Sequence, residues 1–170
     1  MEVLQLKDQF LKALKEEYPA QEINSFFNLL SAAYLGISRL EIALNPKINV
    51  EDFVVLKFEE AQGRLSNHEP IQYILGETEF FGLNFKVDEN VLIPRPETEE
   101  LVQWILDDLA DKENEGLEIL EIGTGTGCIP ISLANHLKNA EISAVDVSEN
   151  ALDIAKQNAV INNVEVHFIL

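Results

Sequence analysis

The chain has 170 residues, of which 46% are hydrophobic and 25% charged. It contains 12 Lys and Arg residues and 30 Asp and Glu residues, which gives a net charge of −18. A chain of about this length can bury roughly two thirds of its unfolded surface, which excludes disorder as its main state. The sequence has no apolar run of about 18 residues, which excludes a membrane span, and no basic cluster, which excludes direct binding of nucleic acid. A single cysteine, Cys128, excludes a disulfide framework. Because the sequence also has no apolar signal region, a cytoplasmic location is expected.

Residues 1–75 are expected to form a small helical bundle, because apolar residues recur there at helical spacing between charged ones. Gly36 is predicted to end the second helix in a left-handed conformation, and Ser38 to cap a short third helix. Asn49 is predicted to cap a fourth helix. The apolar side of that fourth helix is expected to consist of Phe53, Leu56, Ala61 and Leu65.

The pattern changes after Gly76. Residues 77–87 alternate in part between polar and apolar side chains around Gly82, which predicts a β-hairpin, and residues 76–96 are interpreted as hairpin and linker. A helix begins near Pro96. Its apolar stripe is expected to consist of Leu101, Trp104, Ile105 and Leu109, with Trp104 in the core.

The last part of the chain alternates strands and helices. The expected strands are 117–122, 141–145 and 164–170, and the expected helices are 127–137 and 149–158, the second capped by Ser148. This order predicts a parallel sheet with right-handed crossovers, so the chain as a whole is expected to be α+β.

A glycine-rich loop follows the first of these strands, with glycines at positions 123, 125 and 127. Glycine lets the backbone turn tightly and lets a ligand approach the free N–H groups at the start of a helix. The dinucleotide fingerprint requires a glycine where this chain has Cys128, so the spacing favours a methyltransferase nucleoside site over an NAD site. Cys128 itself is interpreted as a small buried thiol and not as a nucleophile.

Two acidic residues end neighbouring strands. Asp146 ends the second strand, where a carboxylate can accept hydrogen bonds from both ribose hydroxyls of a bound nucleoside. Glu121 ends the first strand and could orient the methionine part of a cofactor, although a solvent-exposed acid at a strand end explains it equally well. The histidines are scattered and indicate no metal site; they are His68, His136 and His167.

Several motifs, in their order along the chain, resemble the bacterial peptide-chain release factor glutamine methyltransferases, the PrmC/HemK family. The most specific is the stretch from Val91 to Leu101, Val-Leu-Ile-Pro-Arg-Pro-Glu-Thr-Glu-Glu-Leu. The others are Leu35-Gly-Ile-Ser-Arg39, Gln72-Tyr-Ile-Leu-Gly76, the hairpin Glu79-Phe-Phe-Gly-Leu-Asn-Phe85, the loop Gly123–Gly127 and Ala144-Val-Asp146.

The resemblance implies that residues 97–170 form the first part of a Rossmann-like methyltransferase domain, with a truncated parallel sheet. It also implies that residues 1–75 form a helical domain that recognises the substrate. It implies that Gly123, Thr124, Gly125, Thr126, Gly127, Asp146 and Glu121 bind S-adenosyl-L-methionine. It also makes Arg95, Pro96, Glu97 and Thr98 candidates for the substrate site, although spacing alone explains them equally well as a rigid entrance to the helix.

The reaction that the resemblance implies is methylation of the side-chain amide nitrogen of the glutamine in the Gly-Gly-Gln motif of release factors, a step in translation termination. The family positions that amide with an Asn-Pro-Pro-Tyr motif, which is absent from these 170 residues. The sequence is therefore interpreted as an amino-terminal fragment without catalytic residues, expected to be inactive alone. Three alternatives stay open: a ribosomal-protein glutamine methyltransferase, a noncatalytic protein-binding module and an NAD-dependent enzyme.

Overall fold

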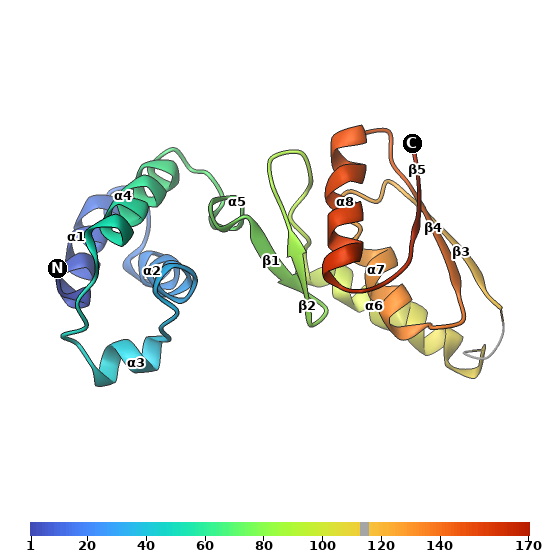
Figure 1. The fold of residues 1–170 in the computed structure, drawn as a ribbon, viewed down its shortest axis with the longest axis horizontal. Coiled ribbons are helices and arrows are strands. Elements are labelled where there is room, and N and C mark those ends of the chain that lie inside the picture. The colour runs from blue at the N-terminus through green and yellow to red at the C-terminus, as the bar shows by residue number, and fades with distance from the viewer. Residues whose placement is uncertain (113–115) are drawn as a thin grey trace. The chain divides into compact units, whose positions relative to one another are not determined.

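The computed structural model describes residues 1–112 and 116–170, which fall into two compact units. We call Met1–Leu75 the helical unit and Gly76–Leu170 the α/β unit; Figure 1 follows the chain through both. Within the described residues, no helix has the length and apolar character needed to cross a bilayer.

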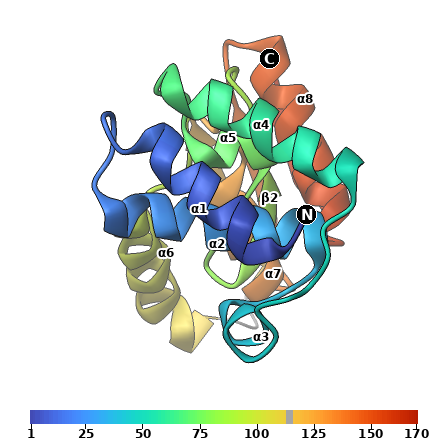
Figure 2. The same ribbon diagram turned by 90° about the vertical axis from the view of Figure 1, so that its left-hand side faces the viewer.

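The helical unit is built around three phenylalanine rings. Its helices are α1 (Val3–Leu14), α2 (Ala20–Leu35), α3 (Arg39–Leu44), α4 (Asp52–Ser66) and α5 (Ile71–Leu75). Helix α1 packs against α2 and α4, as Figure 2 shows. Phe10, Phe27 and Phe58 are buried where these helices meet, and their ring centroids lie 5.3–6.0 Å apart. Such tilted and edge-on aromatic contacts stabilise a small core that has no disulfide.

Local signals at two helix ends of this unit are confirmed. Gly36 has a φ of 66° and donates its N–H to the last turn of α2, which makes it the expected left-handed cap. Ser38 forms a capping box with Glu41 at the start of α3. This interaction lowers the pKa of the Glu41 carboxyl, chiefly through the hydrogen bond from the Ser38 backbone.

Two predictions for α4 are wrong. Glu51 occupies the N-cap position of the helix, whereas Asn49 lies two residues before it and pairs with Glu2 in an isolated antiparallel bridge. Phe53 and Leu56 are not on the buried side, since 57% and 63% of their surfaces are exposed. The buried side consists of Val54, Phe58, Ala61 and Leu65. Helix α4 is apolar on two faces, so periodicity alone could not identify the face that packs.

The α/β unit begins with the predicted hairpin. Strands β1 (Glu77–Phe80) and β2 (Leu83–Lys86) pair antiparallel, and the turn residues Phe81 and Gly82 both have positive φ values, 51° and 72°. Positive φ at both positions gives the turn a twist that matches the flanking strands. The Phe81 N–H also donates to the Glu99 carboxylate at 2.8 Å, which ties the turn to the first turns of α6 (Pro96–Leu109).

The apolar stripe predicted for α6 is partly wrong. Val102 is fully buried, whereas Leu101 is 43% and Trp104 is 65% exposed. Ile105 and Leu109 do pack against the core of the unit. Trp104 is therefore not a core residue in the part of the chain that the structure describes. As in α4, apolar side chains occur on more than one face of the helix.

The predicted parallel sheet is confirmed, with the order β3-β4-β5. The strands are β3 (Glu118–Ile122), β4 (Glu141–Val145) and β5 (His167–Ile169). The helices between them are α7 (Cys128–His136) and α8 (Glu149–Ile161). Before the sheet, α6 continues into a short 3-10 turn, η1 (Ala110–Lys112). Figure 1 shows α7 and α8 on the same side of the sheet. The carboxyl ends of β3 and β4 lie side by side, so the segments that follow these strands are neighbours.

Candidate functional site

The glycine loop and Asp146 meet at the carboxyl edge of the sheet. The loop, residues 123–127, joins β3 to α7, and Asp146 follows β4 directly. The N–H groups of Gly123 and Thr124 both donate to the Val145 carbonyl, at 2.7 and 3.1 Å. These bonds fix the loop against the end of β4, and they place Asp146 beside it.

The three glycines are needed for two different reasons. All have positive φ values, of 84°, 54° and 77° in chain order, which side chains rarely tolerate. A Cβ atom at Gly123 or Gly125 would have no heavy atom within 4 Å beyond those of the residues next to it in the chain, so these two positions leave open space beside the backbone. A Cβ atom at Gly127 would lie 2.9 Å from Ile131 Cδ1 and 3.2 Å from Ala155 Cβ, so this glycine allows α7 and α8 to pack closely.

Side chains from two strand ends hold the loop by hydrogen bonds. Thr124 Oγ1 donates to Glu121 Oε2 at 2.5 Å. The Gly125 N–H donates to Asp146 Oδ2 at 2.8 Å, and the Ser148 N–H donates to Asp146 Oδ1 at 3.0 Å. Both predicted acids therefore contact the predicted loop, and each Asp146 oxygen keeps a lone pair for a further donor.

Glu121 is held in an environment that disfavours its charge. Burial is the main cause that raises the pKa of this carboxyl above its ordinary value; the nearby Asp146 carboxylate raises it further, and the hydrogen bond from Thr124 lowers it. A positive group placed beside Glu121 would relieve this cost. The Glu121 side of this edge of the sheet therefore favours a neighbouring cationic group over a neutral one.

The raised pKa of Glu121 predicts a pH-dependent stability. As the pH rises from the ordinary glutamate pKa towards the raised folded-state pKa, the unfolded chain loses its proton first, so folding becomes less favourable. We expect Glu121→Gln, which keeps an acceptor for Thr124, to raise the unfolding midpoint at pH 7. Thermal unfolding followed by circular dichroism should show this gain shrinking as the pH is lowered to about 4.3. A gain that does not depend on pH would contradict the assignment.

Cys128 lies at the start of α7, directly after the loop. Burial raises the pKa of its thiol to about 11, so the thiolate is scarce at neutral pH. A neutral buried thiol is a weak nucleophile, which supports its interpretation as a packing residue.

Asn158 is a buried residue of this site that sequence reasoning missed. Its side chain, fully buried on α8, donates to the Thr126 carbonyl of the loop at 2.9 Å and to the Lys86 carbonyl of β2 at 3.0 Å, and it accepts the Lys86 N–H at 2.6 Å. The available signal was its position on the stripe of α8 that carries Ala151 and Ala155, where an asparagine needs buried partners.

The Pro-Arg-Pro-Glu-Thr segment does not join this network. Pro96 occupies the first turn of α6, and Arg95, the capping position, is exposed together with Pro96 and Glu97. The Thr98 N–H donates to the Arg95 carbonyl at 2.9 Å. Among the described residues, no hydrogen bond joins Arg95–Thr98 to the glycine loop, so the substrate role of this segment stays a prediction.

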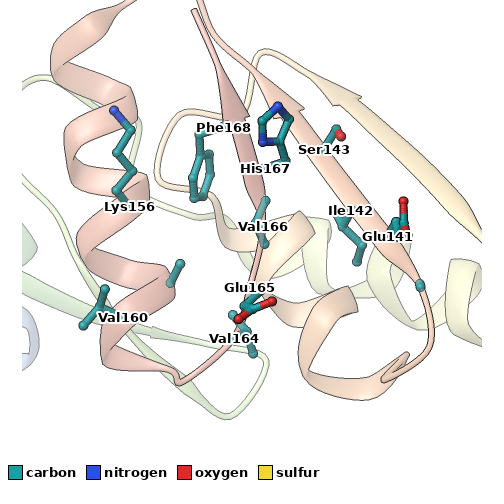
Figure 3. A pocket seen from close by; sticks show the side chains of 12 residues that line it. Glu141, Ile142, Ser143, Lys156, Val160, Val164, Glu165, Val166, His167 and Phe168 are labelled. Carbon is teal, nitrogen blue, oxygen red and sulfur yellow. The ribbon is translucent and has the colours of Figure 1, made fainter.

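A groove of about 850 Å³ lies elsewhere on the α/β unit. Figure 3 shows Lys156 and Val160 on α8 and Val166 and Phe168 on the chain that forms β5. The groove includes Glu141 at the amino end of β4, whereas the glycine loop and Asp146 follow the carboxyl ends of strands. It is therefore separate from the candidate site.

Two family models match the chain. The PrmC N-terminal domain matches residues 2–76, and a methyltransferase domain matches residues 119–170, the stretch that includes the glycine loop and Asp146. The two matches therefore cover most of the helical unit and the sheet of the α/β unit.

The chain is similar to curated bacterial proteins named release factor glutamine methyltransferase. It is 48% identical to that of Flavobacterium psychrophilum over 96% of this chain and 58% of the relative, and 43% identical to that of Bacteroides thetaiotaomicron over 86% of this chain and 51% of the relative. The chain thus spans a little over half the length of these relatives. Among solved structures, the Pyrococcus abyssi tRNA (uracil-54, C5)-methyltransferase in complex with S-adenosyl-L-homocysteine matches 55% of this chain and 22% of its own, with 23% identity and a TM-score of 0.45.

Proposed function

We propose that residues 121–127 and Asp146 of this chain form the S-adenosyl-L-methionine site of a protein methyltransferase. The chain belongs to the release factor glutamine methyltransferase family, which its motifs resemble. The observation that carries the proposal is the hydrogen bond between the glycine loop and Asp146, within the stretch that matches a methyltransferase domain. The similarity to the named relatives over nearly the whole chain supports the same conclusion.

The chemistry of the site fits this cofactor. When bound, S-adenosyl-L-methionine supplies an electrophilic methyl group on a sulfonium. The free oxygen lone pairs of Asp146 would accept the ribose hydroxyls, while the loop stays in place through Gly125. Glu121, whose charge is disfavoured by burial and by Asp146, would face the cationic methionine end of the cofactor. Gly123 and Gly125 leave space for the ligand to approach the backbone.

The proposed substrate is the side-chain amide nitrogen of the glutamine in the Gly-Gly-Gln motif of a release factor. We propose that residues 1–75 recognise that protein, that Arg95–Thr98 contribute to its site, and that the reaction takes place in the cytoplasm. An amide nitrogen is a poor nucleophile, so the rate depends on positioning and electrostatics. Because the 170 residues lack Asn-Pro-Pro-Tyr, we expect this chain alone to bind the cofactor weakly and to transfer no methyl group.

Asp146→Ala tests the cofactor site. Losing a charged acceptor should weaken S-adenosyl-L-methionine binding by about 2–3 kcal/mol, or roughly 30- to 150-fold. Glu149→Ala removes the same charge from an exposed position three residues further on and should leave the affinity nearly unchanged. Affinities can be measured by NMR titration of the chain. Equal effects of the two variants would indicate a general charge effect and remove Asp146 from the site.

A chimera tests the proposed reaction. The chain would be followed by the part of the Flavobacterium psychrophilum relative that lies beyond their region of similarity. We expect the chimera to add one methyl group to the glutamine of a release factor, as measured by peptide mass spectrometry, and Asp146→Ala in the chimera to abolish most of this activity. A folded chimera that binds the release factor but transfers no methyl group would support a noncatalytic binding module instead.

A further inference from the structure

Asn158 joins the hairpin to the glycine loop through three backbone groups. Its Nδ2 donates to the carbonyls of Thr126 and Lys86, and its Oδ1 accepts the Lys86 N–H. Two carbonyls require donors and one N–H requires an acceptor, so these partners fix the orientation of the amide. Neither an aspartate nor a leucine of similar size could satisfy all three groups.

The bond to Thr126 completes the support of the loop. Thr124 is held by Glu121, Gly125 by Asp146 and Thr126 by Asn158, so three consecutive loop residues are held from β3, from the end of β4 and from α8. Of these three contacts, the one made by Asn158 also reaches the hairpin. The Asn158 side chain is fully buried, so water cannot replace its partners without a local opening of the structure.

We infer that Asn158 is a positioning residue that couples the cofactor loop to the hairpin, so that S-adenosyl-L-methionine bound at the loop also stabilises β2. This inference rests on the proposed function for its ligand, while the coupling itself exists without ligand. Through this coupling, the stabilisation that cofactor binding gives the loop would extend to β2. The hairpin turn is in turn hydrogen-bonded, through the Phe81 N–H and the Glu99 carboxylate, to the α6 helix that begins at Pro96.

Hydrogen exchange measured by NMR tests the coupling without ligand. The Lys86 N–H and the Gly127 N–H are both hydrogen-bonded, the second to the Thr124 carbonyl. In the unmodified chain we expect their protection to fall in parallel as urea is added, because both open together. Clearly different urea dependences would overturn the inference, and this result needs no variant that might fail to fold.

Variants separate Asn158 from its neighbour. We expect Asn158→Ala to speed exchange at both Lys86 and Gly127 by about tenfold or more. Asn162→Ala is the matched control, because Asn162 bonds the Asn84 carbonyl of the hairpin and the backbone of α8 but not the loop. It should leave Gly127 unchanged. Unchanged exchange at Gly127 in folded Asn158→Ala would overturn the inference.

Added S-adenosyl-L-methionine separates this inference from the proposed function. In the unmodified chain and in Asn162→Ala, the cofactor should slow exchange at Gly127 and at Lys86, whereas in Asn158→Ala it should slow Gly127 alone. Protection of Gly127 without Lys86 in the unmodified chain would refute the coupling. No protection anywhere would count against the cofactor site itself, and the ligand-free measurements would still decide the role of Asn158.

Discussion

Phe58→Ala is expected to lower the free energy of unfolding of the helical unit by about 3–5 kcal/mol. The Phe58 side chain is 1% exposed, and its ring centroid lies 6.0 Å from that of Phe10, 5.3 Å from that of Phe27 and 5.6 Å from that of Tyr34. Its removal leaves a cavity that the surrounding rings, which belong to α1 and α2, cannot fill without moving. Urea unfolding followed by helical circular dichroism measures the loss.

Phe53→Ala is the matched control for this substitution. Phe53 lies on the same helix, α4, but is 57% exposed. The same chemical change should therefore cost only about 0.5 kcal/mol or less. Similar losses for the two variants would contradict the assignment of the buried face of α4.

Gly127→Ala is expected to destabilise the α/β unit by about 2–4 kcal/mol, combining backbone strain with overpacking. The added Cβ would lie 2.9 Å from Ile131 Cδ1 and 3.2 Å from Ala155 Cβ, and the φ of 77° is itself unfavourable for alanine. Both neighbouring side chains are fully buried, so neither can move out of the way into solvent. Loss of amide protection in β3 and β4, followed as urea is added, measures the effect.

Gly125→Ala separates strain from crowding in the same loop. Gly125 also has a positive φ, 54°, but no heavy atom beyond its two chain neighbours lies within 4 Å of the position of its Cβ. This variant should lose only about 1–2 kcal/mol, from the backbone alone. If Gly125→Ala destabilised the unit as much as Gly127→Ala, close packing of α7 and α8 would not be the reason for the glycine at 127.

Features specified by local chemistry could be predicted from the sequence. The left-handed cap at Gly36 and the capping box at Ser38 depend on residues within one turn of the helix. The neighbouring positions of the glycine loop and Asp146 followed from strand order, because the carboxyl ends of adjacent parallel strands meet at one edge.

Features that depend on tertiary packing could not be predicted in the same way. Helices α4 and α6 carry apolar residues on two faces, so the exposure of Phe53 and Trp104 becomes clear only when the partners of each helix are known. Asn158 could be recognised as buried from its place on α8. Its partners could not, since Thr126 and Lys86 lie 32 and 72 residues away along the chain.

The most direct test of the cofactor site is an NMR titration of the 170-residue chain with S-adenosyl-L-methionine, with NAD as the competing ligand. We predict concentration-dependent shifts of the amide signals of Gly123, Gly125, Gly127 and Asp146 with S-adenosyl-L-methionine, and none at these positions with NAD. Shifts of the same signals with NAD, or no shift with S-adenosyl-L-methionine at millimolar concentration, would contradict the assignment of this loop as a methyltransferase cofactor site.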